Sequence, residues 1–209
     1  MLEKRNFYIN GSWVAPKKSS DIEVINPATE KACAVISLGR KDDVNDAVLS
    51  AKEAFKTWGY STREDRIALL ETFYTLYKKR WNDITDAIIQ EMGAPRDFAS
   101  KLQTGTGASH TKSFIRYLKE FEFEKPLGEH AKNQRLIYEP KGVCALITPW
   151  NWPMNQVTLK VIPALASGCP SATSPPAFAV DVTSSVHRME RPAQHLLAHP
   201  CIPSHSTPA

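Results

Sequence analysis

Apolar side chains in the middle of the chain recur every three or four residues, the spacing that places them on one face of a helix. This pattern predicts four helices, over residues 44–58, 61–81, 84–92 and 97–121. Asp42 or Asp43 is the expected N-cap of the first helix, and Ser61 with Glu64 is the expected capping box of the second. Because the aromatic residues of these helices share the helical spacing, we assign them to the core.

The segment before these helices has the shorter periodicity of strands. Asn10-Gly11 lies between apolar flanks and predicts a type I′ hairpin over residues 7–14, since this turn needs a positive φ at both central positions. Residues 22–25 and 33–37 predict a second strand pair, joined through a turn at Asn26-Pro27. We assign both pairs to the scaffold.

A strand, a rigid loop and a helix are predicted between Gly142 and Gly168. Residues 143–148 form a continuous apolar run, which is typical of a parallel strand buried on both faces. The next five residues, PWNWP, contain two prolines and force a turn. Helical spacing resumes at Met154, and Gly168 is placed to end that helix.

Asn151 lies in this loop, at the carboxyl end of the predicted strand, where open α/β sheets bind their ligands. Its amide offers two uncharged N–H donors, which suit an oxyanion that exists only during a reaction. Asparagine also supports turns and caps helices. Spacing alone leaves both interpretations open.

The PWNWP loop is part of a longer resemblance. Lys160 follows Asn151 by nine residues, and the helix ends in PALASG at residues 163–168. Residues 8–13 (YINGSW) and 26–30 (NPATE) agree with the same pattern. Together these segments closely resemble the aldehyde dehydrogenase superfamily, from about Phe7 to Cys169.

The resemblance implies a truncated α/β, aldehyde dehydrogenase-like fold in four segments. These are the amino-terminal hairpins and the helical part of the cofactor-binding domain (1–124), a projecting hairpin of the oligomerisation region (125–141), the first strand, loop and helix of the Rossmann-like cofactor domain (142–169), and a divergent, disordered tail (170–209). Since the family forms dimers or tetramers, a homo-oligomer is expected.

The resemblance also implies an activity and its site. The family oxidises an aldehyde to a carboxylic acid with NAD or NADP, through a thiohemiacetal and a thioester on a cysteine. Asn151 then matches the oxyanion donor, and Lys160 matches a lysine that relays or positions a proton. The nicotinamide end of the cofactor matches Ile147, Thr148, Pro149, Trp150 and Asn151, and the start of the substrate tunnel matches Trp152.

Composition and charge argue against a nucleic-acid partner, a membrane span and a zinc site. The net charge is +4 and the lysines are interleaved with acids, so no nucleic-acid partner is predicted. No apolar stretch approaches the about 20 residues of a membrane span, and no signal-peptide region follows Met1, which favours the cytoplasm. The four cysteines are not spaced for zinc, Cys144 is assigned to the core, and none matches the nucleophile.

The sequence changes character after Cys169. Residues 170–209 contain no lysine, glycine, tryptophan or tyrosine, and the family's next strand and cofactor-contacting lysine are missing. We therefore hypothesise a frameshift near codon 169 or 170. A zinc site at His187, His195, His199 and His205 is a weaker alternative, because intervening prolines interrupt any shared helix face.

The family's nucleophile motif, Gly-Gln-x-Cys, and its glutamate motif, Glu-Leu-Gly-Gly-Lys, are also not in the chain. The sequence thus predicts a member of an oxidoreductase family that is itself an inactive amino-terminal fragment. The alternative is a non-catalytic interaction module that associates with full-length relatives through residues 134–139.

Overall fold

The structure is a computed structural model that describes residues 1–174. The helices are α1 (Lys41–Trp58), α2 (Arg63–Lys79), α3 (Trp81–Met92), the π-helix η1 (Phe98–Thr104), α4 (Gly105–Glu120), the 3-10 helix η2 (Glu129–Ala131) and α5 (Pro153–Ala166). The strands are β1 (Leu2–Lys4), β2 (Phe7–Ile9), β3 (Ser12–Val14), β4 (Asp21–Asn26), β5 (Lys31–Ser37), β6 (Glu124–Pro126), β7 (Arg135–Ile137), β8 (Cys144–Ile147) and β9 (Ser171–Ser174).

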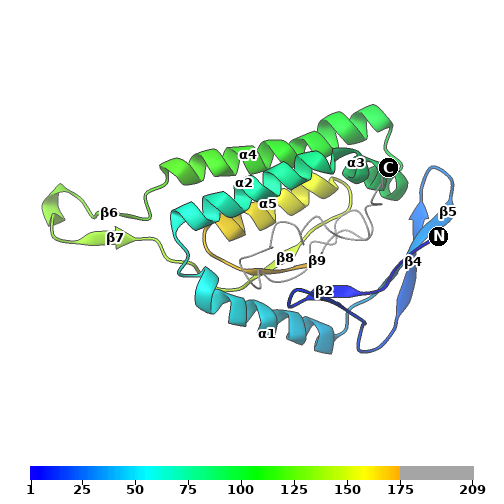
Figure 1. Ribbon diagram of the computed structural model, residues 1–209, viewed down its shortest axis with the longest axis horizontal. Helices are drawn as coiled ribbons and strands as arrows, with labels where there is room; N and C mark the ends of the chain where they lie inside the picture. The colour runs from blue at the N-terminus through cyan, green and yellow to red at the C-terminus, as the bar shows by residue number, and fades with distance from the viewer. Residues whose placement is uncertain (175–209) are drawn as a thin grey trace, which may run out of the picture.

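Helices α2, α4 and α5 run side by side and form one layer of the molecule (Figure 1). The parallel pair β8–β9 lies between this layer and α1. Strands β4 and β5 lie at one end of the molecule, and the hairpin β6–β7 projects from the other end. The predicted α/β class and the helical part of the chain are therefore confirmed.

The core lies between the helices. Its fully buried side chains include Trp58, Leu70, Tyr77 and Ile162, and Phe73 is 2% exposed. Trp58, Phe73 and Tyr77 are thus core residues, as predicted, whereas Phe121, just after α4, is 43% exposed and does not belong to the core.

The helix starts differ from the predicted ones by a few residues. Helix α1 begins at Lys41 with Arg40 as its N-cap, so neither Asp42 nor Asp43 occupies the cap position. Asp43 still satisfies the helix end from inside the first turn, because its carboxylate accepts hydrogen bonds from the backbone N–H of Arg40 (2.8 Å) and of Lys17 (2.9 Å). Asp43 therefore does cap the helix end, but it does so from the third position of the helix and not from the predicted N-cap position.

The capping box of α2 is likewise displaced by one residue. It consists of Thr62 and Asp65, not Ser61 and Glu64. The hydroxyl of Ser61 is already committed, since it donates a hydrogen bond to the carbonyl of Trp58 (2.6 Å).

Two further boundaries of the helices differ from the predicted ones. The predicted helix through residue 81 is two helices, because α2 ends at Lys79 and Trp81 begins α3. The predicted fourth helix begins with seven residues of π-helix, η1, before α4.

Close packing explains the glycine-containing stretch at the start of α4. A Cβ on Gly107 would collide with the hydroxyl of Tyr77 and lie 3.2 Å from the Cβ of Met154. Helix α4 can therefore approach α2 and α5 closely only with glycine here. The glycine at this position is thus explained by the packing of the three helices.

The amino-terminal strands follow the predicted turns. Asn10 (φ 53°) and Gly11 (φ 74°) both have the positive φ of a type I′ hairpin between β2 and β3. Strands β4 and β5 are antiparallel, and β1 adds to β5 in parallel, giving the order β1-β5-β4.

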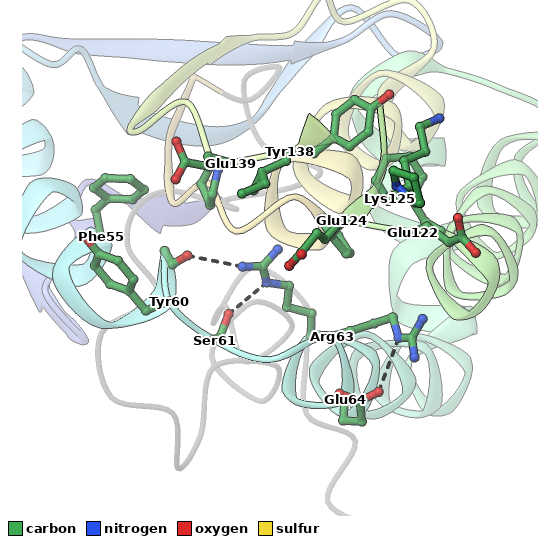
Figure 2. A pocket seen from close by; sticks show the side chains of 17 residues that line it. Phe55, Tyr60, Ser61, Arg63, Glu64, Glu122, Glu124, Lys125, Tyr138 and Glu139 are labelled. Carbon is green, nitrogen blue, oxygen red and sulfur yellow. Dashed lines mark hydrogen bonds and ion pairs between the residues drawn. The ribbon is translucent and has the colours of Figure 1, made fainter. Parts of the chain in front are cut away.

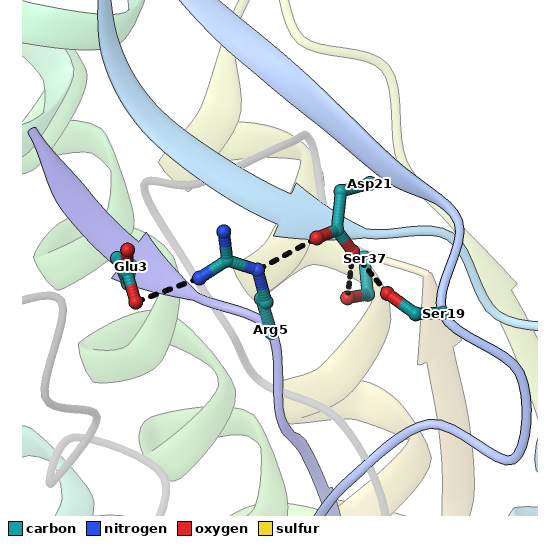
Figure 3. A network of polar contacts seen from close by, with 5 residues as sticks. All are labelled: Glu3, Arg5, Ser19, Asp21 and Ser37. Atoms are coloured by element: carbon teal, nitrogen blue, oxygen red, sulfur yellow. Dashed lines mark hydrogen bonds and ion pairs between the residues drawn. The ribbon is translucent and has the colours of Figure 1, made fainter.

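A polar network ties β1 to β4 and β5 (Figure 3). Asp21 accepts hydrogen bonds from Arg5 Nε (2.6 Å), from Ser37 Oγ (2.8 Å) and from Ser19 Oγ (2.9 Å), while Arg5 also pairs with Glu3 (2.7 Å). These donors hold the pKa of Asp21 below its ordinary value, the hydrogen bond from Arg5 being the largest cause. We assign this network a structural role, because it links the three strands of the sheet through side-chain contacts.

The segment after Cys169 corrects one prediction. Strand β9 (Ser171–Ser174) pairs in parallel with β8, so at least these residues of the predicted disordered tail belong to the sheet. The remainder of that tail, with its four histidines, lies outside the described residues. Ser171 faces the first residue of β8, Cys144, in the register. The boundary that we placed between residues 169 and 170 therefore falls immediately before a strand of the sheet.

The burial of β8 also differs from the prediction. Two of its four residues are exposed, and Ile147 is 77% exposed. In the part of the chain that the structure describes, β8 is therefore not buried on both faces. The apolar run correctly predicted a strand in a parallel pair, but it does not indicate whether other elements cover one face of the strand or both.

Candidate functional site

The predicted strand, loop and helix are present as β8, the PWNWP loop and α5. Trp152 is the N-cap of α5, Pro153 occupies the first turn, and no side-chain hydrogen bond caps this end. Asn151 therefore does not cap the helix, which removes one of its two structural interpretations. An uncapped helix N-terminus leaves backbone N–H groups pointing towards the loop and favours negative charge there.

Two contacts hold the loop against the helical layer. The ring of Trp152 packs edge-on against Phe98 of η1, with centroids 5.6 Å apart. One turn along α5, Asn155 Oδ1 lies 2.8 Å from His110 Nε2 of α4. The loop is thus positioned by elements that were predicted only as core helices, and sequence spacing gave no signal for either contact.

The predicted cofactor residues form an exposed group at the carboxyl end of β8. Ile147 is 77% exposed and Trp150 is 67% exposed, and Pro149 and Asn151 are also exposed. Thr148 differs from them, because it is buried. The loop therefore presents two apolar side chains and one amide to its surroundings, beside the start of a helix.

Lys160 lies further along α5. Its ammonium donates a hydrogen bond to Gln156 Oε1 (2.7 Å), and the side chain is half-buried. Eight residues separate it from the N-cap, which corresponds to about 12 Å along a helix axis. The structure places Lys160 on the same helix as the loop, but not in the loop itself.

A cavity of about 950 Å³ lies elsewhere, between the α1–α2 turn and the base of the β6–β7 hairpin (Figure 2). Its wall combines aromatic residues such as Tyr60 and Tyr138 with charged ones such as Arg66 and Glu124. None of the predicted site residues lines it. The loop is the candidate functional site, because it combines a strand end, a helix N-terminus and an exposed amide.

Comparison with known proteins identifies the family. Residues 13–189 match the model of the aldehyde dehydrogenase family. The chain belongs to the aldehyde dehydrogenase family. This match ends at residue 189 and therefore extends beyond Cys169, where the resemblance seen in the sequence motifs ended.

Individual aldehyde dehydrogenases agree with this assignment. The chain is 44% identical to 3-succinoylsemialdehyde-pyridine dehydrogenase from a Pseudomonas species, over 84% of this chain and 36% of that protein. Among solved structures, an aldehyde dehydrogenase from Bartonella henselae is 45% identical, with a TM-score of 0.84 over 96% of this chain and 40% of that chain.

A cysteine-to-alanine mutant of aldehyde dehydrogenase C from Pseudomonas syringae, complexed with NAD+ and octanal, is 34% identical, with a TM-score of 0.80 over 94% of this chain and 38% of that chain. The chain thus spans less than half the length of these aldehyde dehydrogenases.

Within residues 1–174, the structure offers neither a candidate metal site nor a candidate membrane-spanning helix. This part of the chain contains no group of three or more histidine, cysteine, aspartate or glutamate side chains that could hold a metal ion. None of its helices has the length and apolar character needed to cross a membrane. The cytoplasmic location stays a prediction from the sequence.

Proposed function

We propose that the site at the end of β8 is the cofactor-facing and oxyanion-binding part of an enzyme that oxidises an aldehyde to a carboxylic acid with NAD+ or NADP+. The observation that carries this proposal is the exposed amide of Asn151, which does not cap α5 although it directly precedes its N-cap. An amide held there is available to a ligand.

The loop suits the cofactor. Ile147 and Trp150 offer exposed apolar surface, and the N-terminus of α5 beside them favours anionic groups. Together they fit a ligand that combines a flat ring with negative charge. When bound, NAD(P)+ accepts a hydride; the chain's own residues orient the ring and exclude water from it.

Asn151 acts on the reacting oxygen. Attack of a thiolate on the aldehyde converts the carbonyl oxygen into an oxyanion, and the Asn151 amide donates a hydrogen bond to it. Trp152 forms the start of the substrate tunnel, where its contact with Phe98 fixes the ring. Lys160 assists by positioning or relaying a proton, through the ammonium now bound to Gln156.

The motifs that carry the family's nucleophile and its water-activating glutamate are not in this sequence. Because the two motifs that carry them are absent, we propose that the 209-residue chain does not turn over aldehydes on its own. Losing the covalent nucleophile removes the pathway, whereas losing one oxyanion donor only slows it.

Restoring the reading frame after codon 169 tests the family activity. We expect the restored protein to contain the two missing motifs and to reduce NAD+ or NADP+ with short aldehydes, forming one carboxylic acid per reduced cofactor. Absence of both motifs from the other two frames would overturn the frameshift. Motifs without any reduction would instead overturn the proposed activity.

We further propose that the β6–β7 hairpin associates with other aldehyde dehydrogenase subunits, as a homo-oligomer or with a full-length relative. The hairpin projects from the molecule (Figure 1), and Ile137 at the end of β7 (59% exposed) and the following Tyr138 (43% exposed) offer apolar surface. Co-purification with a full-length relative, weakened by Ile137→Glu, supports this surface. Purely insoluble expression of the chain contradicts it.

A further inference from the structure

The cavity between the α1–α2 turn and the β6–β7 hairpin contains a buried arginine. Its volume of about 950 Å³ lies in the range of small-molecule pockets, about 300–1,000 Å³. Arg66 of α2 lines this cavity, although it is only 5% exposed. No residue that we propose for aldehyde oxidation lines it. The cavity is therefore a separate candidate for a binding site.

The guanidinium of Arg66 forms no ion pair with any residue that the structure describes. It donates hydrogen bonds to Ser61 Oγ (2.9 Å) and to the carbonyls of Gly59 (3.3 Å) and Ala166 (3.5 Å). All three acceptors are uncharged, and they use three of the five N–H groups of the guanidinium. A buried charge without a counter-ion is costly, because it has lost the water that would solvate it. A ligand that carries an anion would supply the missing partner.

The position of the guanidinium is fixed by its packing. Its central carbon lies 5.3 Å from the centroid of the Phe123 ring, which is a cation–π contact. A Cβ on Gly168 would lie only 2.5 Å from Nη2 of Arg66, so the turn after α5 packs directly against the charged group. Because this packing holds the arginine before any ligand arrives, little side-chain entropy is lost when an anion binds.

The outer wall of the cavity is acidic and aromatic. Four exposed glutamates line it, which are Glu64, Glu122, Glu124 and Glu139. Figure 2 shows Glu139 on the same side of the cavity as the rings of Phe55 and Tyr60. Glu139 forms no ion pair with any residue in the described part of the chain, and Tyr60 is 86% exposed. A free carboxylate beside aromatic rings favours a cation.

We propose that this cavity binds a small zwitterion, an amino acid with an apolar side chain. The ligand's carboxylate binds Arg66, its ammonium faces Glu139 and Tyr60, and its side chain packs against the aromatic wall. The mixture of charges decides against two simpler ligands. The glutamates repel a polyanion such as inorganic phosphate, and the buried guanidinium repels a simple cation.

Three related ligands test this proposal on the unmodified 209-residue chain. L-phenylalanine has both charges, 2-phenylethylamine lacks the carboxylate, and 3-phenylpropanoate lacks the ammonium. In calorimetric titrations we expect phenylalanine to bind most tightly. Loss of the carboxylate should raise Kd about 10–100-fold, as for a hydrogen-bonded charge, and loss of the ammonium about 2–5-fold, as for an exposed ion pair.

Two results of these titrations would overturn the proposal. If phenylalanine does not bind, or binds no better than 2-phenylethylamine, Arg66 does not receive a carboxylate. If 3-phenylpropanoate binds at least as tightly as phenylalanine, the acidic wall does not receive an ammonium. Neither result depends on a substitution that could disturb the fold.

Matched substitutions locate the ligand in the cavity. Arg66→Met should raise the Kd of phenylalanine about 10–100-fold. Arg63→Met is its control and should leave Kd unchanged, because Arg63 is an exposed arginine of the same wall that already pairs with Glu64 (3.2 Å). Urea unfolding of both variants shows whether the buried substitution preserves the fold.

A second pair of variants removes only exposed charges. Glu139→Gln should weaken phenylalanine to the affinity of 3-phenylpropanoate. Glu122→Gln is the control, since Figure 2 shows Glu122 on the other side of the cavity, where Lys125 also lies. An unchanged Kd in Glu139→Gln, or an equal loss in Glu122→Gln, would contradict the proposed orientation of the zwitterion.

Discussion

Replacing Asn151 with alanine in the frame-restored protein is expected to lower kcat by about 10²–10³, the usual cost of losing one oxyanion donor. The binding of NAD+ should change little, because the amide acts on an oxygen whose negative charge develops only during the reaction. Steady-state rates at saturating aldehyde, together with a fluorescence titration of the cofactor, separate these two quantities.

Two control variants sharpen this test. Asn151→Asp keeps the shape of the side chain but replaces its N–H donors with a carboxylate, so it should lose at least as much rate as the alanine variant. Asn45→Ala removes an exposed amide from α1 and should leave the rate unchanged. An Asn151→Ala enzyme with the original kcat would show that the loop does not bind the oxyanion.

Replacing Gly168 with alanine is expected to destabilise the fold by about 2–5 kcal/mol, since backbone strain and overpacking add. Gly168 has a φ of +80°, and a Cβ there would lie 2.5 Å from Arg66 Nη2 and 2.8 Å from Pro140 Cγ. The substitution therefore strains the turn after α5 and displaces the buried guanidinium. Urea unfolding followed by tryptophan fluorescence measures the change in free energy.

Gly142→Ala is the matched control for this prediction. Gly142 also has a positive φ, of +118°, but a Cβ would meet no atom within 4 Å. Its substitution should cost only the backbone strain, about 1–3 kcal/mol. Equal losses in the two variants would contradict the claim that Arg66 packs tightly against the turn.

Local sequence patterns predicted much of the fold because they report on interactions between near neighbours. Asn10-Gly11 specified its turn, the helical spacing of apolar residues located the four helical regions, and Gly168 ended α5 with a positive φ. Capping residues were displaced because several polar side chains compete for the same helix end. Asp43 and Thr62 both act through hydrogen bonds between residues three positions apart, and this spacing alone does not say which of several neighbouring candidates makes them.

The rest of the fold depends on residues that are distant in the sequence. Arg66 contacts the carbonyl of Ala166 across 100 positions, and Cys144 lies beside Ser171 only because β8 and β9 pair. Composition could not reveal β9, since serine, alanine and threonine form it in a segment that otherwise lacks a strand pattern.

Part of the candidate site could likewise be predicted from the sequence, and part of it could not. The PWNWP loop could be recognised from the sequence, because its two prolines restrict the backbone locally and its motif consists of consecutive residues. Its attachment through Phe98, and the pairing of His110 with Asn155, require α4 and η1 to pack against α5. The roles of Asn151, Lys160 and the cofactor residues remain proposals that only activity and binding can test.

The most direct measurement is NAD+ and NADP+ reduction by the purified 209-residue chain with a panel of short aldehydes. Our account predicts no sustained reduction, because the chain contains the proposed oxyanion donor and the proposed cofactor-facing loop but neither the nucleophile motif nor the glutamate motif. Sustained reduction that is lost in Asn151→Ala would contradict it, and would show that another residue of this chain, with Cys169 the first to be substituted, attacks the aldehyde.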